Sequence, residues 1–309
     1  MKHGFSSARE KLAPAPFVLI CGRMKLIEIQ APDFDLRTTL DSGQVFHWEP
    51  LGAGFAGMIG DRAVYLEQID DKAFVTPGTA LAEIAHYFAL DHPLREICAA
   101  FPDDPAMVAA RDYCAGLRII RQPVWECLAS FITSSMKQVA HIRQMSRALR
   151  ERFGEPRPLL DRTLYTFPSA ARIAQATEAE LRGCALGYRA KNLRATAERV
   201  ASGEAELEAW RALADDELRV ALCRLPGVGA KVANCVMLFA FERLRAFPID
   251  VWIERVLREK YFPRARKLTA LRLRTFCDEY FGAQGGYAQQ YLFHHARKTT
   301  ARRRVRRAK

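Results

Sequence analysis

Short apolar runs separated by turn residues dominate the chain between residues 33 and 76. Glycine, aspartate and proline punctuate these runs, which is typical of strands joined by tight turns. The pattern predicts an antiparallel meander with strands at 44–48, 54–59, 62–66 and 72–76. One helix is expected to follow at 80–90, and one or two more between residues 93 and 117.

After residue 121 the apolar positions repeat with the period of a helix. Trp125, Leu128 and Ile132 begin this series, which continues to Leu149 and stops at Gly154. The remaining helices are predicted at 169–176, 178–184, 190–201, 215–223, 230–243, 251–261, 269–281 and 287–298. Strands followed by a long series of helices predict an α+β fold.

The two patterns divide the chain into two domains. Residues 24–121 are predicted to form an N-terminal antiparallel sheet domain with helices, and residues 122–298 an all-helical domain. A C-terminal helix is expected to pack back on the first domain. Residues 1–23 are expected to be a disordered leader, because the apolar patch at 17–20 is too short for a signal-peptide core.

Charge is concentrated at the C-terminus, where residues 299–309 are predicted to be a basic tail. From Arg297 to Lys309 there are eight basic and no acidic residues, and without them the net charge falls from +12 to +4. Such a tail favours polyanions through counterion release. A solvated tail with no specific role is the alternative.

The composition excludes several classes of protein. No apolar run approaches the length of a membrane span. The eight cysteines form no C-x-x-C pair, so neither a zinc ribbon nor an iron–sulfur framework is indicated. They are typical of small core residues in a reducing cytosol.

The most informative segment is Leu225-Pro226-Gly227-Val228-Gly229, which lies between two predicted helices. Its glycines permit a tight turn and close backbone approach. The helix that follows presents unpaired N–H groups and a positive dipole end, which together bind a phosphate. The segment therefore predicts a DNA-gripping hairpin, and an ordinary helix–helix connection is the alternative.

Two residues near this hairpin are candidates for catalysis. Lys231 lies just inside the second helix and is a candidate amine nucleophile. Asp250 follows 19 residues later, directly before a predicted helix, where aspartate is also a preferred N-cap. Capping would hold this carboxylate ionised and aimed at an oxocarbenium-like sugar. An exposed phosphate-binding lysine and a purely structural cap remain the alternatives.

Three further segments carry weaker signals. Gly43 begins an aromatic run that is read most simply as a core strand. Tyr188 and Arg189 follow Gly187 in a loop that could wedge a base stack or could simply end a helix. Gln289 and Phe293 are four residues apart on the last helix, so they face one pocket or the core.

Taken in order, these pieces resemble the helix-hairpin-helix DNA glycosylases, and within them a bacterial-type 8-oxoguanine DNA glycosylase/lyase. The similarity runs from residue 34 to residue 298. It is carried by segments 42–48, 126–135, 186–190, 225–235 and 248–251. The resemblance implies a TBP-like N-terminal sheet domain followed by a helical HhH-GPD glycosylase domain.

The resemblance also implies a reaction and its residues. Lys231 would attack the anomeric carbon, expel the base and form a Schiff base that leads to β-elimination, while Asp250 stabilises charge at the sugar. Four residues would bind the flipped base. The carbonyl of Gly43 would accept the N7–H of 8-oxoguanine, Phe293 and Cys235 would lie on the two faces of the base, and Gln289 would bind the Watson–Crick edge of the base. DNA contacts would come from Met136, His141, Tyr188, Arg189, Gly227, Gly229 and Trp252.

No cofactor is required by this reaction. The resemblance implies only a monovalent or divalent cation held by the hairpin carbonyls of Cys223, Leu225 and Val228. No cysteine cluster follows Asp250, so an iron–sulfur cluster is not expected. The expected partner is double-stranded DNA containing 8-oxoguanine, bound by a monomer in the cytoplasm at the nucleoid, with no membrane association.

The chain departs from the eukaryotic pattern where the opposite base is read. Met136-Lys137-Gln138 stands in place of three asparagines, and His141 in place of an arginine. Methionine can wedge but cannot make paired hydrogen bonds to a base edge, so weaker selectivity for cytosine is predicted. Trp252 stands where the eukaryotic pattern has a histidine, so the resemblance does not define the phosphate contacts of the residue that follows the aspartate of position 250.

Two other functions are consistent with parts of the sequence. A 3-methyladenine-type glycosylase would share the fold, although such relatives generally lack the hairpin lysine and hydrolyse with aspartate alone. A non-catalytic DNA-binding module would need the hairpin and the basic tail but neither Lys231 nor Asp250.

Overall fold

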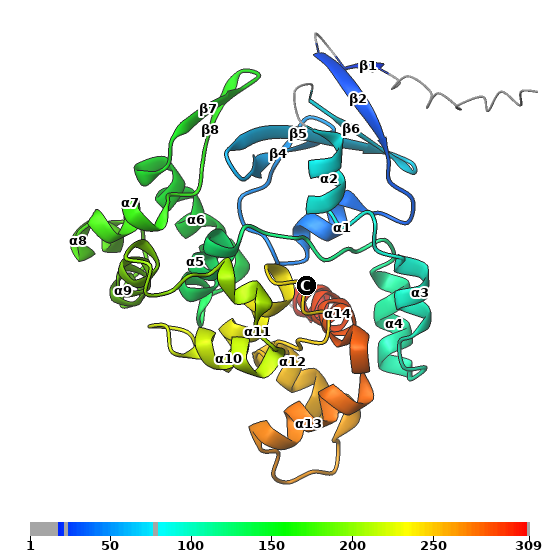
Figure 1. The fold of residues 1–309 in the computed structure, drawn as a ribbon. Coiled ribbons are helices and arrows are strands. Elements are labelled where there is room, and N and C mark those ends of the chain that lie inside the picture. Colours follow the sequence, from blue (N-terminus) through cyan, green and yellow to red (C-terminus); the bar gives the residue numbers. More distant parts are fainter. Residues whose placement is uncertain (1–17, 22–23, 77–79, 308–309) are drawn as a thin grey trace, which may run out of the picture.

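A six-stranded antiparallel sheet and a larger group of helices make up the protein (Figure 1). The computed structural model describes the backbone of residues 18–21, 24–76 and 80–307. The strands run in the order β1-β2-β6-β5-β4-β3. Their bounds are β1 Val18–Cys21, β2 Met24–Gln30, β3 Glu49–Leu51, β4 Gly54–Ile59, β5 Arg62–Ile69 and β6 Lys72–Val75. This arrangement confirms the predicted α+β class.

Both faces of the sheet are covered. Two helices, α1 (Leu36–Asp41) and α2 (Leu81–Tyr87), bury Leu40 and Ile84 against one face, in a cluster with Val64 of β5. On the other face, a second hairpin from the helical domain contributes Leu159 to a separate cluster. This hairpin consists of β7 (Pro156–Leu159) and β8 (Arg162–Tyr165).

The helical part holds the larger core and surrounds α5 and α11. The remaining helices of the first part are α3 Leu94–Ala99 and α4 Pro105–Tyr113. The others are α5 Val124–Ser134, α6 Val139–Phe153, α7 Ala170–Gln175, α8 Glu178–Gly183, α9 Arg189–Ala201, α10 Asp215–Cys223, α11 Ala230–Phe239, α12 Val251–Val256, α13 Ala270–Tyr280 and α14 Gly285–Arg307. Short turns of other helix types lie at Ala209–Ala212, Leu257–Tyr261 and Gly282–Gln284. Within the described residues, no helix is long and apolar enough to cross a membrane.

The segment 44–48, predicted as a strand, is irregular, and that prediction is wrong. Successive side chains of this segment do point in opposite directions, but Val45 packs in the sheet cluster while Phe46 packs in the helical core. Gln44 is buried and donates to the Arg118 carbonyl at 2.8 Å while accepting from the Ile120 N–H at 2.7 Å. The chain therefore crosses between two cores here instead of lying in a sheet.

Other differences lie at the edges of the predicted elements. Helix α1 lies inside the segment expected to contain only strands, and the hairpin β7–β8 was not predicted. Residues 18–21, expected to be part of a disordered leader, form β1 and pair with β2, and the rest of that leader lies outside the described residues. Helix α11 ends at Phe239, four residues earlier than predicted.

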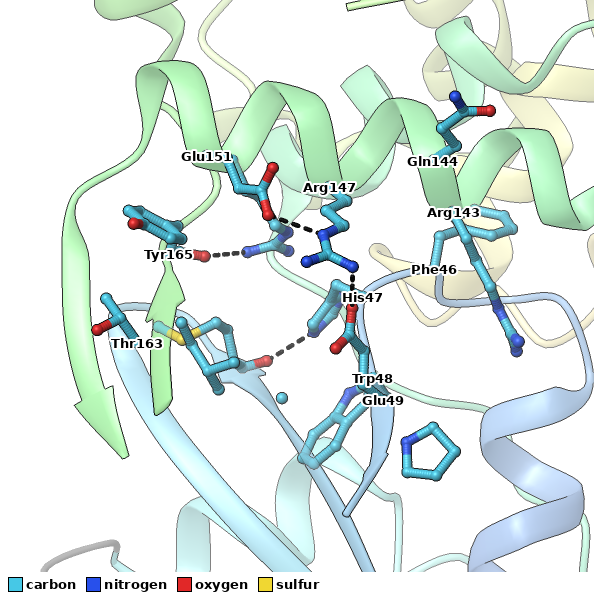
Figure 2. A pocket seen from close by; sticks show the side chains of 15 residues that line it. Phe46, His47, Trp48, Glu49, Arg143, Gln144, Arg147, Glu151, Thr163 and Tyr165 are labelled. Carbon is cyan, nitrogen blue, oxygen red and sulfur yellow. Dashed lines mark hydrogen bonds and ion pairs between the residues drawn. The ribbon is translucent and has the colours of Figure 1, made fainter. Parts of the chain in front are cut away.

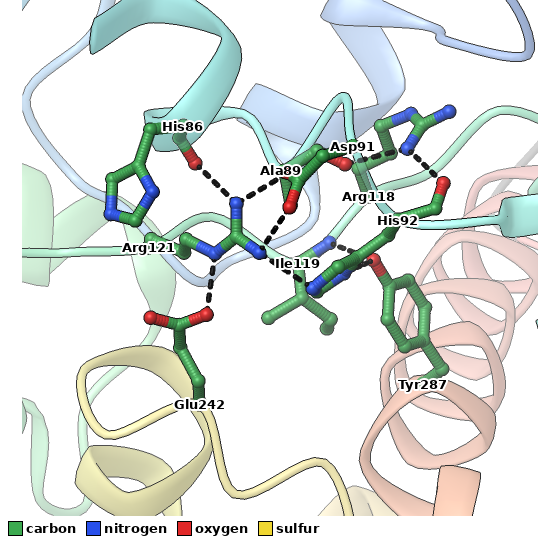
Figure 3. A network of polar contacts seen from close by, with 9 residues as sticks. All are labelled: His86, Ala89, Asp91, His92, Arg118, Ile119, Arg121, Glu242 and Tyr287. Carbon is green, nitrogen blue, oxygen red and sulfur yellow. Dashed lines mark hydrogen bonds and ion pairs between the residues drawn. The ribbon is translucent and has the colours of Figure 1, made fainter. Parts of the chain in front are cut away.

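Two arginines lie in the segment between the domains, and one of them ties the domains together (Figure 3). The side chain of Arg121 pairs with Asp91 and donates to Glu242 at 2.6 Å, so it joins the first domain to the end of α11. The Arg118 guanidinium is buried and donates to the carbonyls of Ala89 and Pro32. Arg121 therefore connects the two domains, while Arg118 holds the segment on the first domain.

Helix α14 packs back on the first domain, as predicted. It lies against α4 (Figure 1). Tyr291 donates to the Leu117 carbonyl at 3.0 Å, and the Gln290 amide donates to the Ser42 carbonyl at 3.0 Å. The backbone remains helical as far as Arg307, through most of the segment predicted as a basic tail.

Candidate active site

The glycine-rich turn joins α10 to α11 and exposes the start of α11. Gly227 adopts φ +81°, and a Cβ built on it would lie 2.8 Å from the Cβ of Asn192. Glycine is therefore required there by both backbone conformation and space. Gly229 is the N-cap of α11 and has open space around it, so the first N–H groups of α11 are accessible to a phosphate.

Lys231 lies in the first turn of α11 and points toward α5. Its Nζ is 3.5 Å from the hydroxyl of Ser134 and 5.0 Å from the centre of the Phe131 ring. The lysine is half-buried. The Cys235 thiol, one helical turn further along, contacts the same amine, and burial raises the pKa of Cys235 to about 11. The thiol therefore stays neutral beside the lysine at physiological pH.

Asp250 caps α12, as the sequence predicts. Its Oδ1 accepts from the N–H groups of Trp252 at 3.0 Å and Ile253 at 2.9 Å. Burial raises the pKa of Asp250 above the ordinary aspartate value, although the N–H groups and the nearby Lys231 charge act in the opposite direction. The carboxylate is thus fixed by α12 and is electrostatically coupled to the lysine.

The four residues predicted to bind the base come from three different elements. A Cβ built on Gly43 would lie 3.1 Å from Cε1 of Phe293, so this turn and α14 are in direct contact. Gln289 is buried, and its Oε1 has no hydrogen-bond partner within the described part of the chain. Cys235 contacts Lys231, which places α11 beside the same group.

An unpaired carbonyl oxygen inside a protein costs free energy unless a ligand satisfies it. The Oε1 of Gln289 is therefore an acceptor that a ligand could satisfy, one helical turn from Phe293. This is what a pocket for a polar heterocycle requires.

The predicted wedge residues lie on two loops that are joined by Arg189. Met136 is 94% exposed and adopts φ +55°, and Tyr188 is 59% exposed. Arg189 is buried, and its guanidinium donates to the Ser135 carbonyl, with Nε at 2.8 Å. In this structure Arg189 positions the loop that carries Met136 instead of extending toward solvent.

The other predicted contacts lie nearby on the same domain. His141 is exposed on α6, and Trp252 is half-buried at the start of α12 with the Arg255 guanidinium 5.4 Å from its ring centre. In the hairpin, the Leu225 carbonyl accepts the Val228 N–H at 3.1 Å. A cation held by these carbonyls would share that oxygen. Among the described residues, no cluster of three or more His, Cys, Asp or Glu side chains could hold a metal.

Phe131 and Ser134 were given no role from the sequence, yet both contact the Lys231 amine. They lie three residues apart on α5, so they face the same side of that helix. The pattern of apolar positions marks α5 as core, and only the fold shows that one of its faces meets α11.

A cavity of about 380 Å³ lies elsewhere (Figure 2). It is enclosed by the segment after Gly43, by β4, by α6 and by β8, and neither Lys231 nor Asp250 lines it. The buried Glu126 carboxylate lies next to it, pairing with Arg150 and lying 3.3 Å from the His47 ring. This cavity marks the junction of the domains and is separate from the candidate catalytic residues.

The helical hairpin, the lysine inside it and the capping aspartate define a class of protein, the helix-hairpin-helix base-excision DNA glycosylases. Residues 129–278 match the HhH-GPD superfamily of base excision DNA repair proteins. Residues 26–128 match the N-terminal domain of 8-oxoguanine DNA glycosylase.

Three known proteins illustrate the similarity. The N-glycosylase/DNA lyase of Saccharomyces cerevisiae is 30% identical, over 81% of this chain and 74% of its own. The structure of MBOgg1 with a low affinity DNA ligand is 31% identical with a TM-score of 0.85, covering 93% of this chain and 99% of that one. The Clostridium acetobutylicum 8-oxoguanine glycosylase/lyase, bound to DNA with cytosine opposite 8-oxoguanine, is 29% identical with a TM-score of 0.84, covering 89% and 96%. The chain belongs to the 8-oxoguanine DNA glycosylase/lyase family.

Proposed function

We propose that this protein removes 8-oxoguanine from double-stranded DNA and then cleaves the strand, with Lys231 as the nucleophile. Membership of the family makes it a base-excision DNA glycosylase with lyase activity. The observation that carries the assignment of Lys231 is the position of its amine, which lies at the hairpin, beside the Ser134 hydroxyl and within electrostatic reach of Asp250.

In the proposed reaction, the Lys231 nitrogen forms a bond to C1′ as the bond from C1′ to the base breaks. The bonding electrons leave with the base, and the sugar passes through a state with positive character that the Asp250 carboxylate stabilises. Opening of the sugar ring gives a Schiff base. Loss of a proton from C2′ then expels the 3′ phosphate, and hydrolysis releases the lysine.

The base must leave the helix before the amine can reach C1′. We assign Gly43, Phe293, Cys235 and Gln289 to the pocket that receives it. Their support is the contact of Gly43 with Phe293 and the unpaired Oε1 of Gln289. Met136 and Tyr188 are assigned to the space that the base leaves, because both are exposed on loops joined through Arg189.

The DNA backbone is assigned to the hairpin, with Gly227 and Gly229 letting a phosphate approach the N–H groups of α11. His141 and Trp252 are assigned to flanking contacts. We expect no iron–sulfur cluster and no required cofactor, with a monovalent or divalent cation at the carbonyls of Cys223, Leu225 and Val228. We also expect a monomer that acts in the cytoplasm at the nucleoid.

Base release from two duplexes tests this function. One contains a single 8-oxoguanine and the other a single 3-methyladenine. Release of 8-oxoguanine with strand cleavage is the expected result. Release of 3-methyladenine alone would mean that the chain is a monofunctional alkyl-base glycosylase. Salt-sensitive binding without release from either duplex would leave only a DNA-binding module.

A further inference from the structure

Helix α14 places a third residue, which is charged, beside the two that are already assigned to the base. Gln289, Phe293 and Arg297 are each four residues apart, so they share one face of the helix. The Arg297 guanidinium lies 5.7 Å from the centre of the Phe293 ring. Its Nη1 would lie 3.6 Å from a Cβ built on Gly43. Arg297 therefore lies at the contact between Gly43 and Phe293.

The guanidinium is held in place from one side only. Its side chain is 16% exposed, and Nη2 donates to the backbone carbonyl of Asp41 and lies 3.8 Å from its carboxylate. Nη2 also lies 3.4 Å from Nδ1 of His294. Within the described residues, the buried Nε has no hydrogen-bond partner, and every hydrogen bond of the guanidinium is made by Nη2. An N–H donor on a nearly buried cation costs free energy while it has no acceptor, so it favours binding a ligand that supplies one.

The surroundings of Asp41 leave an excess of positive charge. Besides Arg297, the carboxylate pairs with Lys298 and lies 3.5 Å from Arg143 of α6. Burial alone would raise the pKa of Asp41, but these three cations lower it, so the carboxylate is ionised. One negative charge against three positive charges makes the site attractive to an anion or to developing negative charge.

We propose that Arg297 contacts the flipped base directly and is a specificity residue of the pocket. The inference rests on the proposed roles of Gly43 and Phe293. An 8-oxopurine presents an N–H at N7 flanked by carbonyl oxygens. The Gly43 carbonyl and the adjacent Arg297 N–H form the complementary acceptor and donor, so each group of that edge finds a partner.

Arg297 also supplies charge where the reaction needs it. The electron pair of the broken bond moves onto the departing base, and its carbonyl oxygens share the negative charge. Burial lowers the pKa of Arg297, but the ordinary pKa of a guanidinium is so far above neutral that the group keeps its positive charge throughout. Its stabilisation of the departing base is stronger in the transition state than in the ground state, and it therefore increases the rate of base loss.

Two substrates separate this role from a structural one. We would compare single-turnover base release from an 8-oxoguanine duplex with strand cleavage at a preformed abasic site, which contains no base. Arg297→Met should slow base release by about tenfold to a hundredfold, because a charge-assisted hydrogen bond is lost. Cleavage at the abasic site should change less than about twofold, and Arg297→Lys should recover part of the loss.

Arg143→Met is the matched control, because Arg143 pairs with the same Asp41 but does not contact Gly43 or Phe293. It should not separate the two activities. Equal losses on both substrates for Arg297→Met would show a structural role, and no loss would show that Arg297 does not touch the base. Either result overturns the proposal. If the unaltered protein cleaves abasic sites but releases no 8-oxoguanine, the proposed function fails instead.

Discussion

At the scale of single residues, the site combines groups whose structural and chemical roles overlap. Asp250 caps α12 and also lies within electrostatic reach of the Lys231 charge. Arg189 was expected to read DNA but is buried against the Ser135 carbonyl. Such overlap means that truncating a residue to alanine would disturb two roles at once. Substitutions that preserve one role are therefore the informative ones.

Asp250→Asn separates capping from catalysis. Asparagine caps a helix about as well as aspartate, so α12 should stay intact. Loss of the charge should reduce base release by about a hundredfold or more in single-turnover assays. Asp250→Ala should lose the cap as well, at a cost of about 1 kcal/mol in the free energy of unfolding. Full activity in the asparagine variant would restrict Asp250 to a structural role.

The same variant has a defined dependence of stability on pH. The folded-state pKa of Asp250 is raised, so its ionised form destabilises the fold at any pH above that value. Asp250→Asn should therefore be at least as stable as the unaltered protein at pH 7. The difference should shrink as the pH falls through the folded pKa toward the ordinary aspartate value, about 3.9. Denaturant unfolding at several pH values measures this trend.

Met136 gives a prediction about the opposite base. Its side chain can fill space but cannot form the paired hydrogen bonds that are worth about 1–3 kcal/mol of discrimination. Excision of 8-oxoguanine opposite each of the four bases should therefore proceed at rates within about tenfold of one another. A steep drop for the three bases other than cytosine would show that another residue reads this position, and Arg189 would be the first to examine.

At the scale of elements, the hairpin between α10 and α11 contains one glycine that the fold requires and one that we propose DNA binding requires. Gly227→Ala should destabilise the protein by about 1–2 kcal/mol, because φ is positive and the added Cβ meets Asn192. Gly229→Ala has space and an extended φ of −101°, so the melting temperature should hardly change. Its affinity for duplex DNA should nevertheless fall, because the new methyl group faces the approaching phosphate. Unchanged DNA affinity in Gly229→Ala would place the phosphate elsewhere.

The sequence correctly predicted those elements whose buried side chains all pack into one core. Helices with a single buried face, such as α9 and α10, were placed within one or two residues. Segment 44–48 was misread because its side chains alternate between two cores, which a local pattern cannot distinguish from the two faces of a strand. The hairpin β7–β8 was missed because its prolines resemble helix-ending signals, and only its contact with the sheet explains it.

The site was predictable where a residue is marked by its position in a motif. Lys231 and Asp250 follow from the hairpin and from the helix start, and the structure couples them electrostatically. Ser134 was not predicted, because it reaches the amine from α5, which is distant in sequence from the hairpin. Arg297 was not predicted, because only the packing of α14 brings its guanidinium beside Gly43. Contacts of that kind depend on how α5 and α14 pack against the rest of the fold.

At the scale of the whole molecule, the proposed base pocket depends on the two domains being held together. Gly43 comes from the sheet domain, while Lys231 comes from the helical domain and Phe293 from α14. Arg121 of the connecting segment and the packing of α14 hold these parts together (Figure 3). Loosening this connection should therefore affect the base pocket before it affects the hairpin.

Arg121→Met tests the connection. At pH 7 the free energy of unfolding should fall by about 1 kcal/mol, because the hydrogen bonds to Asp91 and Glu242 are lost. Hydrogen bonding to Arg121 lowers the pKa of Asp91 to about 2. Its contribution is present above the unfolded-state pKa and disappears as the pH falls toward 2, so the two proteins should converge in stability there. A gap that stays constant down to pH 2 would contradict this pairing.

The central claim is that the Lys231 amine becomes covalently bound to the sugar of an excised 8-oxoguanine. Borohydride reduction in the presence of a duplex with one such lesion tests it most directly, because it converts a Schiff base into a stable adduct. We predict an adduct with the unaltered protein and with Lys191→Gln, which removes an exposed lysine on the nearby helix α9. Lys231→Gln should give none. An adduct that persists in Lys231→Gln, or base release without any adduct, would contradict the account.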